Sequence, residues 1–193
     1  MSIAITEIEP ELYQLAQMYF DLKPSHNVIN YTEDGRVFLT RNSHTYNIII
    51  SDVYYSFFSI PIQFTTKEFF QEAKESLTEN GVFIGNFVGN LDKNAPSFIF
   101  SEMKTFKNVF ENSYFFAVDS PNSTLPQNII FLGINGTKQI TFDESKKSTD
   151  PILNGLDQKT IEVNKINFDS YQIITDNYAP IEYMVSKVIN RVY

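Results

Sequence analysis

The chain has 193 residues, of which 42% are hydrophobic and 20% charged, a composition typical of a folded globular protein with one core. Its formal net charge of -8 argues against a nucleic-acid-binding protein, because phosphates are bound by clustered Lys and Arg, but it is compatible with a small cationic amine as partner. The absence of Cys excludes disulfides, thiolate metal sites and cysteine nucleophiles, and two His residues alone cannot make a zinc site.

The sequence also lacks the features of a membrane protein or a secreted one. No stretch reaches the roughly 18 apolar residues of a membrane-spanning helix, and the first four residues have neither the basic start nor the apolar run of a signal peptide. We therefore expect a cytoplasmic protein with no membrane partner.

Strands and helices alternate through the first 110 residues. Hydrophobic periodicity predicts strands at 3–8, 28–31, 46–52 and 82–88. It predicts helices that begin at Pro10 and at 65–68, a helical turn or two at 37–39 and a helix over 97–110. The third strand is continuously apolar, which is typical of a strand buried on both faces. Thr65 and Glu68 have the spacing of a capping box, and Asn80-Gly81 is expected to end that helix in a left-handed conformation. This alternation predicts a mainly parallel sheet.

The pattern changes after residue 110. Strands are predicted at 114–118 and 128–133 with no helix between them, which favours an antiparallel pair. A polar, loop-rich region follows at 135–169, and a last helix is predicted at about 180–191. We therefore predict one α/β domain over residues 1–193, with the mainly parallel sheet and antiparallel C-terminal hairpin of a methyltransferase-type Rossmann fold.

Three acidic residues follow successive predicted strands. Glu7, Asp34 and Asp52 each stand at a carboxyl end, and ligands of open α/β sheets bind outside these ends. Each acid also has an ordinary structural explanation, Glu7 near a helix start, Asp34 in an Asp-Gly turn and Asp52 as a solvated strand end. Taken together, the three acids are expected to converge on one crevice.

Several motifs in order resemble the spermidine synthase-like family of aminopropyltransferases. They are TEIEPEL at 6–12, DGRVFL at 34–39, YNIIISD at 46–52, SIP at 59–61 with FTTKEFF at 64–70, and TDNYAPIE at 175–182. The resemblance implies transfer of an aminopropyl group from decarboxylated S-adenosylmethionine to a diamine such as putrescine, with release of methylthioadenosine. It implies that Glu7 holds the ribose, that Asp34 beside Gly35 meets the adenine amino group, and that Asp52 helps to deprotonate the attacking amine.

Two departures from the family pattern bear on function. Tyr55 replaces the second acid that usually grips the diamine, so Tyr55 is the candidate substrate-binding residue. No Gly precedes Gly35, so the glycine-rich loop of the family and the first strand before it are expected to be missing. In the family fold, this first strand lies in the sheet between the strands that end here at Glu7 and Asp52. That loss would leave the sheet either gapped or re-paired.

The departures leave three explanations and three functions open. We favour the first explanation, that the sequence is a fragment. In the second, another chain or a second copy of this chain supplies the missing strand. In the third, the two neighbouring strands pair directly in a degenerate domain. The preferred function is an aminopropyltransferase domain, inactive as this fragment. The alternatives are a non-catalytic Rossmann-like binding or oligomerisation domain and a small-molecule methyltransferase that uses S-adenosylmethionine.

Overall fold

The computed structural model describes residues 1–53, 61–94, 96–137 and 139–192 and divides the chain into two compact units, Met1–His44 and Thr45–Tyr193. Each unit is described by itself below. None of the described helices is both long and apolar enough to cross a membrane.

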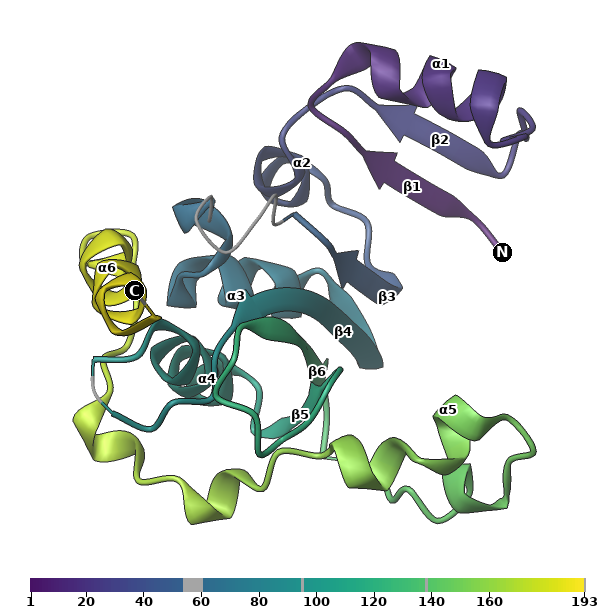
Figure 1. Ribbon diagram of the computed structural model, residues 1–193. Helices are drawn as coiled ribbons and strands as arrows, with labels where there is room; N and C mark the ends of the chain where they lie inside the picture. The colour runs from purple at the N-terminus through teal and green to yellow at the C-terminus, as the bar shows by residue number, and fades with distance from the viewer. Residues whose placement is uncertain (54–60, 95, 138, 193) are drawn as a thin grey trace. The chain divides into compact units, whose positions relative to one another are not determined.

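The first unit has two strands and two helices (Figure 1): β1 (Ile3–Thr6), α1 (Pro10–Tyr19), β2 (Val28–Tyr31) and α2 (Gly35–Arg41). β1 and β2 are parallel, with Ile3 opposite Val28 and Thr6 opposite Tyr31. Pro10 occupies the first turn of α1, where the missing N–H costs no helical hydrogen bond. Asp34 caps α2. The predicted start of α1 at Pro10 is confirmed, and the helical segment predicted at 37–39 lies within α2, which begins two residues earlier.

The second unit contains a four-stranded sheet formed by β3 (Tyr46–Ser51), β4 (Leu77–Gly89), β5 (Asn112–Ala117) and β6 (Gln127–Ile134). The strand order is β3-β4-β6-β5, in which β3 and β4 are parallel and β6 is antiparallel to both of its neighbours. The predicted combination of parallel strands with an antiparallel pair is confirmed.

Three longer helices complete this unit: α3 (Lys67–Glu75), α4 (Phe98–Val109) and α6 (Ile181–Val192). The region 135–169 is loop-rich as predicted, with the short helix α5 (Pro151–Asn154) and single 3-10 turns at Ser145–Lys147, Leu156–Lys159, Val163–Lys165 and Phe168–Ser170. A further 3-10 turn at Ile62–Phe64 precedes α3.

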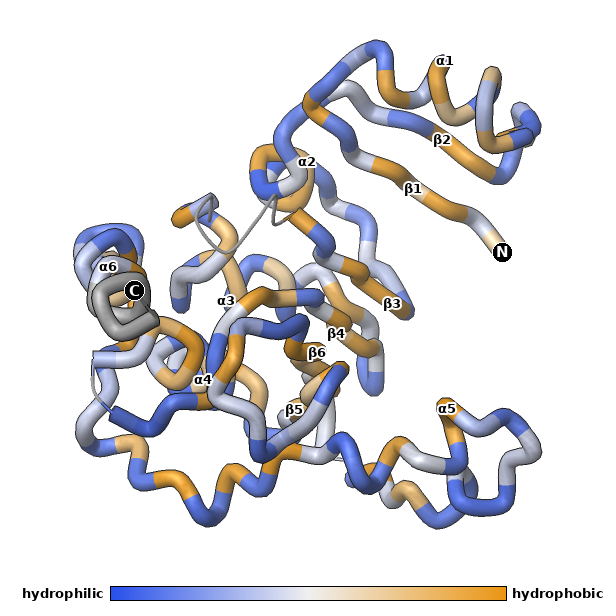
Figure 2. The backbone as a smooth tube through the Cα atoms, viewed as in Figure 1, coloured by the Kyte–Doolittle hydropathy of each residue, from blue (hydrophilic) through white to orange (hydrophobic). Residues whose placement is uncertain are grey.

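Phenylalanine fills the core between α3, α4 and one face of the sheet. Alternate residues of β4 and β6 point to this face, and the hydrophobic positions of the strands stand out in orange in Figure 2. The fully buried phenylalanines are Phe69, Phe70, Phe83, Phe87, Phe100, Phe106, Phe110, Phe115 and Phe131. Phe106 lies at the centre, with its ring centroid 4.7 Å from that of Phe110 and 5.0 Å from that of Phe70.

Two local expectations were wrong. The side chains of Ile48 and Ile50 in β3 are 57% and 72% exposed, because β3 is an edge strand and α3 and α4 pack on the other face of the sheet. Thr66, and not Thr65, caps α3, accepting a hydrogen bond from the Phe69 N–H, so the expected capping box with Glu68 does not form.

The end of α3 also differs from the prediction. The helix ends at Glu75, and Leu77 already belongs to β4. Asn80, with φ of 59°, takes the left-handed conformation that was expected of Gly81. Asparagine tolerates this conformation because its short side chain can bond locally. The turn signal lies within a long strand and does not end the helix.

The described strands form two separate sheets, β1-β2 and β3-β4-β6-β5. The first sheet belongs to the first unit and the second sheet to the second unit.

Gly133 in β6 allows the core phenylalanines to approach the strand. A Cβ atom at this position would lie 2.6 Å from Phe110 Cγ and 2.7 Å from Phe106 Cζ, and both rings are fully buried. We expect Gly133→Ala to lower the free energy of unfolding by about 1–3 kcal/mol, because the rings must shift in a close-packed core. Urea denaturation checks this value.

Gly155→Ala is the matched control, since its Cβ would meet its nearest atom, Pro151 O, at an ordinary 3.4 Å. We expect a change within about 0.5 kcal/mol. Equal effects of the two substitutions would contradict the packing argument.

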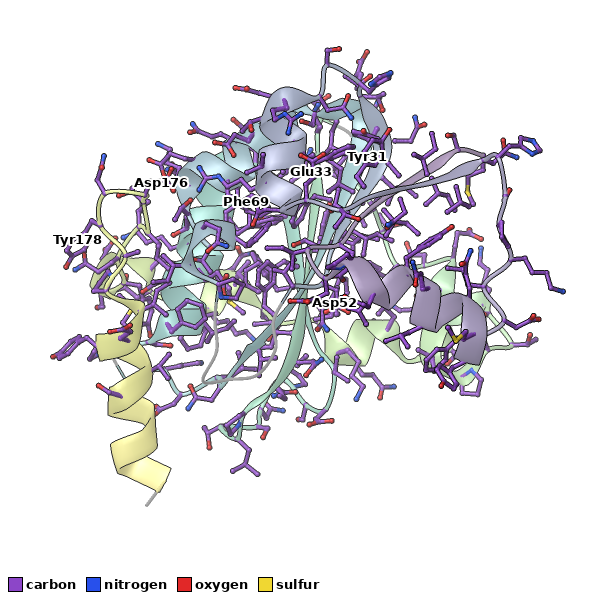
Figure 3. The ribbon with its side chains drawn as sticks, turned by 90° about the horizontal axis from the view of Figure 1, so that it is seen from above. Tyr31, Glu33, Asp52, Phe69, Asp176 and Tyr178 are labelled. Carbon is purple, nitrogen blue, oxygen red and sulfur yellow. The ribbon has the colours of Figure 1, made fainter. Side chains whose placement is uncertain are left out.

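Residues 171–178, here called the C-terminal strap, are held to α3 and α4 largely by side chains. Thr105 Oγ1 accepts a hydrogen bond from the Ile174 N–H at 2.9 Å, and Thr66 Oγ1 donates to Asp176 Oδ1 at 2.7 Å. The Asp176 N–H in turn donates to Glu68 Oε2. Asp176 and Tyr178 are labelled in Figure 3. This part of the TDNYAPIE motif therefore has a clear structural role in fixing the strap.

Tyr171 at the start of the strap makes the stability of the fold sensitive to alkaline pH. Its hydroxyl donates to Lys93 O at 2.7 Å, and burial, with a further contribution from the charge of Asp92, raises the pKa of Tyr171 above its usual value. The neutral phenol is thus favoured in the folded protein. Its stabilising contribution is complete below about pH 10, the ordinary tyrosine pKa, and is lost as pH rises through the higher folded-state value.

We therefore expect the free energy of unfolding to fall less steeply above about pH 10 in Tyr171→Phe than in the unmodified chain. Urea denaturation at a series of alkaline pH values checks this. Parallel pH profiles of the two proteins would contradict it.

Candidate active site

Asp52 directly follows β3, at the carboxyl end of the parallel pair β3 and β4. The pairing of Ser51 with Gly85 brings Asp52 beside Asn86, the next residue of β4. Asn86 Nδ2 donates a hydrogen bond to Asp52 Oδ1 at 3.0 Å. One carboxylate oxygen is thus held by an amide donor, while the side chain as a whole stays exposed to solvent (Figure 3).

A second asparagine extends this contact across the sheet. Asn128 Nδ2, from β6, donates to Asn86 Oδ1 at 3.1 Å. Asp52, Asn86 and Asn128 therefore form a chain of hydrogen bonds over three adjacent strands, which we call the Asp-Asn-Asn relay. The sequence-based prediction missed both asparagines. Their signal was one amide in each of the otherwise apolar strands predicted at 82–88 and 128–133.

The relay lies on the face of the sheet opposite α3 and α4. Side chains alternate along a strand, so Ile50 and Asp52 point to one side and Ser51 to the other. Ser51 is buried, whereas Ile50 and Asp52 are exposed. The Asp52 carboxylate is therefore accessible from solvent at the edge of the sheet where parallel strands present their carboxyl ends.

Glu7 and Asp34 lie in the first unit, after the neighbouring parallel strands β1 and β2. Glu7 Oε1 accepts a hydrogen bond from the Glu9 N–H at 2.9 Å, close to the start of α1. Asp34 Oδ1 accepts from the Arg36 N–H at 2.8 Å and from the Val37 N–H at 3.1 Å, which makes it the N-cap of α2. Asp34 thus caps the following helix, whereas Glu7 forms a local turn contact just before α1.

Each of these acids has the structural role that an ordinary turn or cap would give it, and each makes these contacts through one carboxylate oxygen. Gly35 is the first residue of α2. The nucleoside-binding roles of Glu7, Asp34 and Gly35, and the convergence of Glu7 and Asp34 with Asp52, stay predictions. Tyr55 lies outside the described residues.

An ion pair and an aromatic contact lie close to Asp34, the N-cap of α2. Glu33, one residue before Asp34, forms an ion pair with Arg41 of α2 at 3.1 Å, and the Tyr31 and Phe38 rings are 4.7 Å apart (Tyr31 and Glu33 are labelled in Figure 3). These contacts fix α2 after β2, and hence the position of Asp34. Among the residues that the structure describes, no three His, Asp or Glu side chains are grouped as metal ligands.

A polar cavity of about 380 Å³ lies in the second unit, at the end of the sheet opposite to the carboxyl end of β3. It is lined by Gln71, Lys74, Glu75, Asn108, Val109 and Asn135. These residues come from the C-terminal parts of α3 and α4 and from the position directly after β6, near the amino end of β4. None of them is a predicted site residue, and this cavity does not contain the relay.

No protein-family model matches the chain. A curated relative, the polyamine aminopropyltransferase of Vibrio vulnificus, is 32% identical over 117 residues, which are 59% of this chain and 37% of that protein. A probable polyamine aminopropyl transferase of Bifidobacterium longum is 25% identical over the whole chain and 45% of its own length. The chain therefore spans less than half the length of these two relatives.

Two solved structures share the fold. A probable spermidine synthase from Corynebacterium glutamicum matches 90% of this chain and 63% of its own with a TM-score of 0.68 and 24% identity. Human methyltransferase-like protein 13, in complex with SAH, matches 82% of this chain and 70% of its own with a TM-score of 0.61 and 21% identity. These structures show that the chain has a methyltransferase-type fold. With the curated relatives, they support a chain that is spermidine synthase-like.

Proposed function

We propose that this chain forms part of an aminopropyltransferase, in which Asp52 accepts a proton from a diamine that attacks decarboxylated S-adenosylmethionine. The main support is the position of Asp52: an exposed carboxylate at the carboxyl end of β3, with one oxygen held by Asn86. The curated relatives named polyamine aminopropyltransferase indicate the substrate class.

The reaction requires what a carboxylate at this position can supply. A diamine near neutral pH is an ammonium and has no lone pair for attack until it loses a proton. A carboxylate attracts the cation and accepts that proton. The nitrogen lone pair then forms a bond to the carbon next to the sulfonium, the carbon–sulfur bond breaks, and its electron pair stays on sulfur, which leaves as the thioether methylthioadenosine.

The nucleoside is assigned to Glu7 and Asp34 in this proposal. A carboxylate can accept hydrogen bonds from ribose hydroxyls or from the adenine amino group through more than one lone pair. The contacts of Glu7 and Asp34 with backbone N–H groups each use one oxygen, so the other oxygen of each remains the proposed contact for the ligand. The acidic character of the chain, with a formal charge of -8, is compatible with a cationic acceptor amine.

The direct test incubates the purified chain, and separately the complete aminopropyltransferase of which it is proposed to form part, with decarboxylated S-adenosylmethionine and putrescine. Methylthioadenosine is measured by liquid chromatography and mass spectrometry. A parallel incubation with S-adenosylmethionine distinguishes a methyltransferase, which would release S-adenosylhomocysteine instead. Calorimetric titration with methylthioadenosine measures nucleoside binding without turnover. Methylthioadenosine formation would support the proposal. Release of S-adenosylhomocysteine alone, or neither product together with no nucleoside binding by the complete enzyme, would overturn it.

A further inference from the structure

The orientation of the Asn86 carboxamide decides what the Asp52 carboxylate meets. An Asn side chain has a donor end, Nδ2, and an acceptor end, Oδ1. Asn128 donates to the Oδ1 end, which leaves the Nδ2 end directed at Asp52. A flipped amide would place an oxygen against the carboxylate and a donor against the Asn128 donor, so both contacts would become repulsive.

The strand register makes this arrangement possible. Asn86 lies on β4, the strand between β3 and β6, and pairs with Ile130, while Asn128 pairs with Val88. Asn86 and Asn128 are therefore diagonal neighbours on one face of an antiparallel pair, a separation that polar side chains of this length can bridge. Asn86 reaches β6 on one side and the end of β3 on the other.

We propose that Asn86 is a positioning residue for Asp52 and that Asn128 fixes the orientation of the Asn86 amide. The inference rests on the proposed function, in which Asp52 is the proton acceptor. The relay occupies Asp52 Oδ1 and holds the side chain in one rotamer, which presents Oδ2 to the amine. A proton acceptor that is oriented by a further group is a recurring arrangement in enzyme sites. The conformational entropy of its side chain is then lost when the protein folds, and not when the reaction takes place.

The first arm of the test is independent of activity. In a ¹⁵N–¹H correlation spectrum of the full chain, the side-chain amide pair that disappears in Asn86→Leu belongs to Asn86. We expect this pair to shift in Asp52→Leu and in Asn128→Leu, because each variant removes one of its hydrogen-bond partners. Asn47→Leu is the matched control, and it should leave the Asn86 pair in place. Asn47 also bridges β3 to β4, because its Nδ2 donates to Thr78 Oγ1 at 3.3 Å near the amino end of β4. An Asn86 pair that is unchanged by both relay variants would overturn the inference.

The second arm measures methylthioadenosine formation. We expect Asn86→Leu to lower kcat by about 10–100-fold, as is common for groups that orient a reacting residue, while the KM for the amine changes little. Asn86→Gln, which keeps the carboxamide, is expected to retain more activity than Asn86→Leu, and Asn47→Leu should match the unmodified chain. Circular dichroism confirms that each variant folds.

The outcomes separate the inference from the proposed function. An unchanged kcat in Asn86→Leu, or an equal loss in Asn47→Leu, would overturn the positioning role while leaving the proposed reaction intact. If neither the chain nor the complete enzyme of which it is proposed to form part produces or binds methylthioadenosine, the proposed function fails. The positioning role then fails with it, even where the spectra confirm the hydrogen bonds.

Discussion

Phe106→Ala is expected to lower the free energy of unfolding of the second unit by about 3–5 kcal/mol, as measured by urea denaturation. Phe106 is fully buried, and five phenylalanine rings surround it. Their centroids lie at 4.7 Å (Phe110), 5.0 Å (Phe70), 5.4 Å (Phe131), 5.6 Å (Phe83) and 5.9 Å (Phe115). The loss combines the transfer free energy of the ring with the cost of a cavity that rigid neighbours cannot close.

Leu125→Ala is the control in the same unit, because Leu125 is 67% exposed. We expect a change within about 0.5 kcal/mol. A loss below about 1 kcal/mol for Phe106→Ala would mean that the neighbouring rings collapse into the vacated space, against the close packing described above.

Asp52→Asn is expected to reduce the rate of methylthioadenosine formation by about 10²–10⁴-fold, the usual contribution of general acid–base catalysis. The amide has nearly the shape of the carboxylate but can neither accept the proton effectively nor attract the ammonium by charge. Its oxygen can still accept the Asn86 hydrogen bond, so the fold should be preserved. Steady-state kinetics over a range of amine concentrations measure the effect.

Asp169→Asn serves as the control for the loss of one negative charge, since Asp169 is exposed and lies in the Phe168–Ser170 turn, outside the sheet. Its rate should equal that of the unmodified chain. Equal rates for Asp52→Asn and the unmodified chain would exclude Asp52 as the proton acceptor.

The order of the elements and several helix starts followed from local chemistry. Pro10 has no amide proton to leave unpaired in the first turn of α1, and the hydroxyl of Ser97 accepts a hydrogen bond at the start of α4. The Ser/Pro/Asn-rich connection between β5 and β6 predicted their antiparallel pairing, and the structure confirms it. These features depend on residues close together in the chain, which is why the sequence could determine them.

The resemblance of the ordered motifs to spermidine synthase-like proteins was also readable from the sequence, and the comparisons confirm it. The sequence could place Asp52 at a strand end for the same local reason. It could not distinguish a carboxylate that caps a helix from one that only meets a ligand. Asp34 has a capping role that becomes visible once its contacts with the N–H groups of Arg36 and Val37 are known.

Only the tertiary structure decided the exposure of β3 and the surroundings of Asp52. A run such as Ile48–Ile50 reads the same in a central strand and in an edge strand, because its burial depends on strand order and on which face the helices cover. Asn86 and Asn128 are 42 residues apart in the chain and meet only through the register of β4 and β6. The sequence thus determined the elements and the acid at the end of β3, while long-range strand pairing determined which side chains hold that acid, since such contacts have no local signature.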